Sequence, residues 1–257
     1  MSDEQQTVVL DPAPRRPRRK RWPIVLSVLL VLLVGGLVAA DSLGRHYAQQ
    51  RLEAEIASRL PEGSGAVEVH IGGFSFLAQY LAGSFDQVIL DAPSIAVEGT
   101  TASASIVANG VPTDRTTPVR SGTGRLVIDA EALNEVVTPV DAVGGFQLVD
   151  GVVRYEGRTE FFGLEIAFLA DLTPSVDGGR ILLTPTDVTL TGGGASLRLD
   201  EIFPDISRLE VPFCAAELLP RGVVLEDAII QADALVITVS ARDLVLSSDT
   251  LSARGSC

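Results

Sequence analysis

The sequence predicts a β-rich α+β fold, mainly antiparallel, preceded by one transmembrane helix. Three observations lead to this class: an uncharged stretch near the N-terminus, an amphipathic helical pattern directly after it, and alternating apolar segments separated by short turn signals. Strands that are joined by turns rather than by long helices pair in antiparallel fashion. A chain of 257 residues has room for one large domain or two small ones.

The first 40 residues predict a tail and a membrane span. Residues 1–21 are polar, contain three prolines and end in a basic run, so we expect a disordered basic cytoplasmic tail. Residues 22–40, WPIVLSVLLVLLVGGLVAA, carry no charge. At about 1.5 Å per residue they are long enough to cross a hydrocarbon core of roughly 30 Å. The basic residues before this span and Asp41 after it orient the tail toward the cytoplasm and residues 41–257 outside.

A cleavable signal peptide is the alternative for the same segment. Val38, Ala39 and Ala40 are small residues of the kind that a signal peptidase accepts. The apolar stretch is longer than the usual signal-peptide core of about 7–15 residues, which favours an uncleaved anchor. A lipoprotein is excluded because no cysteine lies near the junction. Either alternative exports the body of the protein.

The exported body begins with a helical pattern and continues in strands. Apolar residues recur every four positions at Ala48, Leu52, Ile56 and Leu60. Beyond Pro61 and the following glycines, period-two alternation marks segments 67–71, 164–172 and 235–241. These patterns predict one helix followed by mainly antiparallel strands.

Charge and composition exclude several kinds of function. Without the six basic and three acidic residues of 1–40, the body holds 14 basic against 30 acidic residues, a formal charge of −16. Such a body repels polyphosphate, so we expect no nucleic-acid partner. Lys20 is the only lysine, which rules out a P-loop or Schiff-base lysine in the body.

The residue types of the body give little support to a catalytic or a metal-binding site. A Ser-His-Asp triad would need His46 or His70, which the patterns place on a solvated helix and an exposed strand, and no G-x-S-x-G occurs. Two histidines and two cysteines are too few for a His-based metal cage or a zinc knuckle. The many carboxylates allow acid/base pairs, but no pair has a distinctive spacing. We therefore expect no catalytic residues, no metal and no cofactor.

The two cysteines are candidates for a disulfide. Cys214 and Cys257 form an even count in an exported body, where disulfides persist. The bond would close a loop of about 40 residues. The alternative is that Cys257, the last residue, has no fixed partner.

An uncharged segment over residues 73–83, GFSFLAQYLAG, is the most unusual part of the body. It places three aromatic residues and two leucines between glycines, in a chain that is only 5% aromatic. One interpretation is a helical turn that fills the core. The other is an apolar lining that accommodates acyl chains, because ligand sites are mostly apolar surface. The candidate lipid-binding residues are Phe74, Phe76, Leu77, Tyr80 and Leu81.

The same segment carries a family resemblance. The order helix, V-E-V-H-I-G-G-F-S-F-L-A-Q-Y-L-A-G, then S-F-D-Q-V-I-L-D-A-P, resembles the LmeA-like phospholipid-binding family of actinobacterial cell-envelope proteins. The stretch 212–225, P-F-C-A-A-E-L-L-P-R-G-V-V-L, resembles the C-terminal pattern of that family. The resemblance covers approximately residues 42–246. It implies a long curved antiparallel sheet wrapped around a helix, as in tubular lipid-binding proteins, and it brings no catalytic motif.

The sequence and the resemblance together lead to one functional hypothesis. The protein is expected to be a membrane-anchored extracytoplasmic phospholipid-binding protein that holds or transfers lipid in cell-envelope (lipoglycan) biogenesis. It is not expected to be an enzyme. Its expected partners are phospholipid, the membrane and envelope glycosyltransferases. Two alternatives remain: a non-catalytic scaffold for those glycosyltransferases, and a carboxylate-dependent glycan hydrolase.

Overall fold

The computed structural model describes residues 22–257 except 98–99, 115, 137–144, 162–163 and 203. The expected tail, 1–21, lies outside the described residues. The chain divides into two compact units, Met1–Ala40 and Asp41–Cys257. The helices are α1 (Trp22–Ala57), α2 (Phe76–Ala82), α3 (Ala130–Val136), α4 (Leu199–Ile202), η1 (Pro204–Arg208), η2 (Ala215–Leu218) and α5 (Ser248–Ser252). The strands are β1 (Glu68–Ile71), β2 (Ser84–Val97), β3 (Thr100–Pro112), β4 (Val119–Asp129), β5 (Gly145–Val149), β6 (Val152–Phe161), β7 (Leu164–Asp177), β8 (Arg180–Gly192), β9 (Ala195–Arg198), β10 (Val211–Cys214), β11 (Val223–Gln231) and β12 (Ala234–Leu244).

Helix α1 contains the expected span. Among the described residues it is the helix that is long and apolar enough to cross a membrane. The apolar residues over its first half are exposed. From Asp41 onward the helix belongs to the second unit, where Ile56 and the following Leu60 pack against Val67, Val69 and Ala92.

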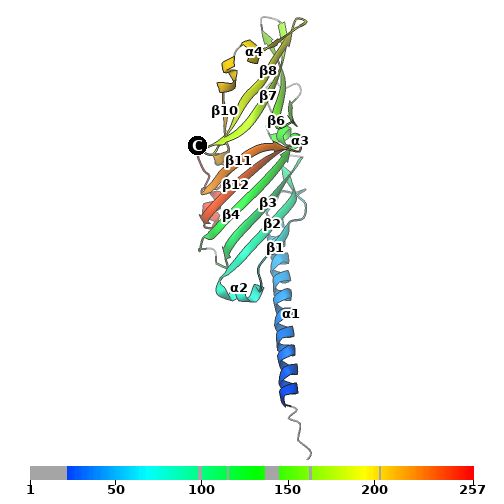
Figure 1. Cartoon of the computed structure of the whole chain (residues 1–257), viewed down its shortest axis with the longest axis vertical. Helices are drawn as coiled ribbons and strands as arrows, with labels where there is room; N and C mark the ends of the chain where they lie inside the picture. The colour runs from blue at the N-terminus through cyan, green and yellow to red at the C-terminus, as the bar shows by residue number, and fades with distance from the viewer. Residues whose placement is uncertain (1–21, 98–99, 115, 137–144, 162–163, 203) are drawn as a thin grey trace, which may run out of the picture. The chain divides into compact units, whose positions relative to one another are not determined.

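The strands form two antiparallel sheets (Figure 1). The first sheet has the order β1-β2-β3-β4-β12-β11, so the hairpin near the C-terminus pairs with β4 and completes a sheet that begins near residue 68. The second sheet has the order β10-β8-β7-β6-β5, with β9 paired to β8. The β-rich antiparallel class is confirmed. The resemblance implied one long curved sheet, whereas the strands are divided between two.

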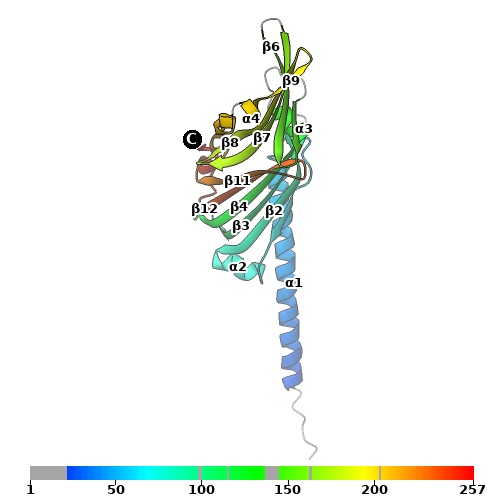
Figure 2. The same cartoon turned by 45° about the horizontal axis from the view of Figure 1, so that its top comes forward.

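The core lies where the two sheets meet and where α1 meets β1 and β2. One cluster joins Ile181 and Ala215 to Leu225 and Ala228 of the first sheet. A second joins Leu148 and Val153 of the second sheet to Leu235 of the first. In both views the second sheet adjoins the β11–β12 side, and α2 lies at the other end of the first sheet (Figures 1 and 2).

The disulfide fastens the C-terminus to an edge of the second sheet. Cys214 ends β10, and its sulfur is bonded to that of Cys257 at 2.08 Å, across 43 positions of sequence. The same end is held by hydrogen bonds from Arg180 Nη2 to the Cys257 carbonyl, 3.0 Å, and from Gly255 N–H to the Leu219 carbonyl, 3.0 Å.

Reduction should lower the melting temperature of the body without unfolding it. Opening a loop of this length removes about 2–4 kcal/mol of stability, while the three hydrophobic clusters do not include either cysteine. Alkylation of the exported protein should label neither thiol before reduction and both after it. Labelling of both thiols in unreduced protein would contradict the bond, and the Cys214→Ser, Cys257→Ser double variant is the control for the thermal measurement.

Candidate functional site

One face of the first sheet is apolar across all six strands. Residues that pair directly across antiparallel strands point to the same face. The pairing register aligns one such row from edge to edge: Val69, Leu90, Ile106, Gly124, Val239 and Leu225. The flanking rows on this face are also uncharged: Ile71, Val88, Ala108, Gly122, Ala241 and Val223 on one side, and Ala92, Ala104, Leu126, Ile237 and Ala228 on the other.

The opposite face contains charged and polar residues among apolar ones. The row next to the central apolar row consists of Glu68, Asp91, Ser105, Arg125 and Thr238. Side chains within it interact, since Ser105 Oγ donates to Asp91 Oδ1 at 2.6 Å. The central rows of one face therefore carry no charge, whereas charged side chains occur in the central rows of the other face.

The two ends of the apolar face are covered, whereas its middle is not. At the β1–β2 edge, Ile56 and Leu60 pack on it. At the β11–β12 edge, the second sheet packs on it through Ile181 and Val176. No residue of β3 belongs to any of the three hydrophobic clusters of described residues. Ile106, in the middle of β3, is 44% exposed.

The middle of this face is floored by small residues. Ala108 pairs with Gly122, and Ile106 pairs with Gly124, so two glycines of β4 lie side by side with an alanine and an isoleucine of β3. A Cβ atom added at Gly122 would meet nothing closer than the Val107 carbonyl oxygen at 3.8 Å. At Gly124 it would lie 2.9 Å from Val239. Space above the sheet is thus open at Gly122 and filled at Gly124.

The second sheet repeats this division. Its row Val188, Ala170, Tyr155 and Phe146 is apolar. The adjacent row on the other face holds Asp171 and Arg154, whose guanidinium donates to both carboxylate oxygens at 2.7 and 2.8 Å. That bidentate contact lowers the pKa of Asp171. The charged face also bears a hollow of about 480 Å³, which is lined by Glu156, Arg158, Thr189 and Thr191 together with Ala167, Phe168 and Leu169.

The five residues expected in the 74–81 segment do not form one surface. Phe76 and Leu77 turn toward α1: a Cβ atom at Gly44 would lie 3.3 Å from the Phe76 ring and 3.9 Å from Leu77. Phe76 is buried, with its ring 5.4 Å from that of Phe85. The other three residues are exposed, Phe74 by 102%, Tyr80 by 58% and Leu81 by 85%. The segment thus contributes Phe76 to the core and presents three apolar side chains outward. Its role as an acyl-chain lining stays a prediction.

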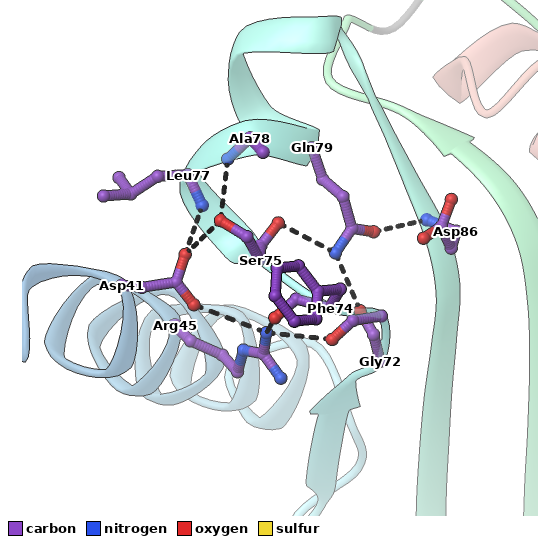
Figure 3. Close-up of polar contacts among 10 residues, drawn as sticks. Asp41, Arg45, Gly72, Phe74, Ser75, Leu77, Ala78, Gln79 and Asp86 are labelled. Carbon is purple, nitrogen blue, oxygen red and sulfur yellow. Dashed lines mark hydrogen bonds and ion pairs between the residues drawn. The ribbon is translucent and has the colours of Figure 1, made fainter. Parts of the chain in front are cut away.

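Helix α2 is held by polar contacts that end on Asp41 (Figure 3). Ser75 caps the helix, because its Oγ accepts from Ala78 N–H at 3.2 Å. Asp41 Oδ1 accepts from Ser75 Oγ at 2.7 Å and from Leu77 N–H at 2.9 Å. Arg45, one turn later on α1, donates from Nη2 to the Gly73 carbonyl at 3.1 Å. Asp41 and Arg45, which follow Ala40 on α1, therefore connect this helix to the apolar segment 73–83.

Gln79 fixes the other side of the turn. Its amide is buried, donates to the carbonyls of Gly72 and Ser75 at 3.1 Å each, and accepts from Asp86 N–H at 2.6 Å. Gly73 has a φ of +95°, and a Cβ atom there would lie 2.4 Å from Gln79 Nε2. A residue with a side chain is excluded at position 73 both by the backbone angle and by this contact.

The hydrogen bonds from Ser75 and Leu77 lower the pKa of Asp41, with Arg45 adding a favourable charge. A carboxylate with a lowered pKa stabilises the folded state above its unfolded pKa of about 3.9, and this contribution disappears as the pH falls through the folded value. Asp41 is therefore ionised at neutral pH and keeps α2 attached there.

We expect Asp41→Ala to lower the melting temperature of the full chain in detergent micelles at neutral pH. The difference from the unchanged protein should stay constant down to a pH of about 4 and shrink below it, as Asp41 becomes protonated. Thermal unfolding of both proteins across this range measures it. Glu55→Ala, which removes an exposed carboxylate on the same helix together with its surface ion pair to Arg59, is the control, because exposed ion pairs contribute little to stability. A difference that persists unchanged in strong acid would contradict the role of the ionised carboxylate.

The histidines and carboxylates of the described residues do not gather into a metal site. No group of three His, Cys, Asp or Glu side chains among them is placed to hold a metal ion. His46 contacts Gln50 on the exposed surface of α1, 3.0 Å between the side-chain nitrogens, and His70 is exposed on β1. The described residues do build a sheet face whose central rows are uncharged, and apolar surface of this kind is what ligand sites mostly consist of.

Comparison with known proteins identifies the family. Residues 39–240 match the model of the LmeA-like phospholipid-binding family. No curated protein and no solved structure matched the chain. The match includes the helix after the span, both sheets and most of the terminal hairpin, and it confirms the resemblance seen in the 67–93 segment. The chain belongs to the LmeA-like phospholipid-binding family.

Proposed function

We propose that this protein is a membrane-anchored, extracytoplasmic phospholipid-binding protein that holds or transfers lipid in cell-envelope (lipoglycan) biogenesis, with no catalysis of its own. Family membership supports phospholipid as the ligand. The anchor, the extracytoplasmic side and the biogenesis role are parts of the proposal. Envelope glycosyltransferases are the proposed protein partners.

The observation that carries the proposal is the uncharged face of the first sheet. Six strands contribute rows without a charged residue, in a body with a formal charge of −16. The half-exposed middle at Ile106 leaves apolar surface in water, which costs about 25 cal/mol for each Å². An acyl chain laid across Ala108, Gly122 and Ile106 removes that surface from water, so binding is driven by burial.

The small residues explain why a chain fits there. Side chains at Ala108 and Gly122 rise little above the sheet, and the space over Gly122 is open. Isoleucine or leucine at these positions would fill the space that the ligand takes. The covered ends, at Leu60 and at Ile181, limit the length of the open part to the central strands.

Gly122→Phe should abolish most phospholipid binding while keeping the fold. The new ring occupies the open space above β4, and an aromatic residue suits a strand better than glycine does. Mass spectrometry of lipid extracted from the purified full chain measures the bound phospholipid, and circular dichroism checks the fold.

Thr123→Phe is the matched control, since the neighbouring residue points to the polar face and is exposed. It should retain the lipid. Undiminished phospholipid in Gly122→Phe would remove this face from the binding site. If the protein without substitutions contains no lipid but still binds an envelope glycosyltransferase, the alternative function as a scaffold is favoured.

The anchor is tested separately. If Trp22–Ala40 stays attached, the full chain should remain in the membrane pellet after carbonate washing, because an uncharged span of this length is inserted in the hydrocarbon core. A variant with Leu30→Arg and Leu33→Arg should move to the supernatant, since arginine is costly at the centre of a bilayer. An intact mass that begins at Asp41 would instead indicate a secreted, soluble protein.

A further inference from the structure

The outward apolar side chains of α2 are not used by the proposed lipid-binding face. Phe74, Leu81 and Tyr80 lie on one short segment and are exposed by 102%, 85% and 58%. The segment is rigid rather than a loose loop, because Ser75 and Gly83 cap the helix at its two ends and the buried Gln79 amide makes three hydrogen bonds. A rigid segment that exposes two fully solvated large apolar side chains is unusual for a surface that meets only water.

The occupant of this surface follows from chain continuity. Asp41 is the residue after Ala40, the last residue of the uncharged span. Its carboxylate accepts hydrogen bonds from Ser75 Oγ and Leu77 N–H, at 2.7 and 2.9 Å. If the span crosses the bilayer, Asp41 lies where the hydrocarbon ends. Ser75 and Leu77, which are hydrogen-bonded to Asp41, then lie close to the same depth.

Charge supports the same occupant. From Ile71 to Phe85 the chain has no Asp, Glu, Lys, Arg or His, although the body as a whole is strongly acidic. This uncharged segment approaches an anionic bilayer without the repulsion that the rest of the surface meets. The nearby turn after β3, whose Thr113 N–H donates to the Gly83 carbonyl at 3.0 Å, carries Asp114. Hydrogen bonds from Thr116 and Thr117 lower the pKa of Asp114, so this carboxylate limits insertion to the headgroup level.

We propose that Phe74, Tyr80 and Leu81 insert into the outer surface of the membrane beside the anchor, as a second, non-spanning contact. This inference rests on the proposed span and goes beyond it, because it concerns a surface of the body itself. The contact holds the sheet at the bilayer, with the Ala108–Gly122 end of its apolar face nearer to the lipid than the end covered by the second sheet.

The test uses the full chain and its single tryptophan. Trp22→Phe removes the only native indole, and Phe74→Trp in that background places one indole in the turn directly before α2. The protein is reconstituted in vesicles of phosphatidylcholine and phosphatidylglycerol in which the phosphatidylcholine is brominated near the ester end of its chains. We expect strong bromine quenching at position 74, because the ring lies among the upper acyl carbons.

Phe213→Trp in the same background is the matched control. Phe213 is an aromatic residue that is also exposed, by 50%, but it lies on β10 in the second sheet. Its quenching should be several-fold weaker. Leu81→Asp, added to Phe74→Trp, should reduce the quenching at position 74 to the level of the control, since a carboxylate is excluded from the acyl region. Circular dichroism confirms that the exposed positions tolerate these changes.

Equal quenching at positions 74 and 213 overturns the inference. An indole at position 74 that is shielded from water in detergent and indifferent to brominated lipid also overturns it, in favour of contact with a second copy of the chain. Carbonate washing of each reconstituted sample shows whether the span is inserted. A failed second contact is therefore distinguishable from a failed anchor, and the phospholipid bound to the sheet is measured independently.

Discussion

The register of the first sheet is the constraint on which the rest of the protein depends. Pairing of Leu90 with Ile106, and of Ile106 with Gly124, keeps Asp91 and Arg125 on the face opposite to the three uncharged central rows. A slip by one residue would bring Asp91 and Arg125 to the face that α1 and the second sheet cover. The bulges in β2 and β11 change the local pairing, yet Ile237 still meets Ala228 on the apolar side.

Partial covering of that face follows from the lengths of the elements. Helix α1 ends at Ala57, and the apolar residues near this end pack only against β1, β2 and the residues next to them. The second sheet reaches the β11–β12 hairpin and the end of β4 near Ile128. Strand β3 lies between these two covers. A protein that needed only a filled core would place larger residues than Ala104, Ala108 and Gly122 there. In the proposed function, a bound acyl chain supplies the missing volume.

Much of the fold could be predicted from the sequence, whereas the site could be predicted only in part. Alternation in 164–172 and 235–241 located β7 and β12, because leucine and isoleucine give a clear period of two. Strand β3 alternates in the same way, but its inward residues are mostly alanine, which carries little signal against Ser and Thr. The partners of each strand, and so the shared face, depend on contacts far apart in sequence, such as that of β4 with β12. Local patterns do not contain that information.

The 74–81 segment illustrates the same limit at the scale of single residues. Its composition marked it as unusual, but composition cannot tell which of its five apolar residues face the body and which face outward. That division is made by Gly44, which admits the ring of Phe76, and by Asp41, which holds Ser75 from 34 positions earlier. Once Phe76 is fixed inward, helical geometry turns Leu81 outward. Gly44 and Asp41, both close to the end of the uncharged span, thus decide together which side chains of this segment are buried in the body and which are exposed.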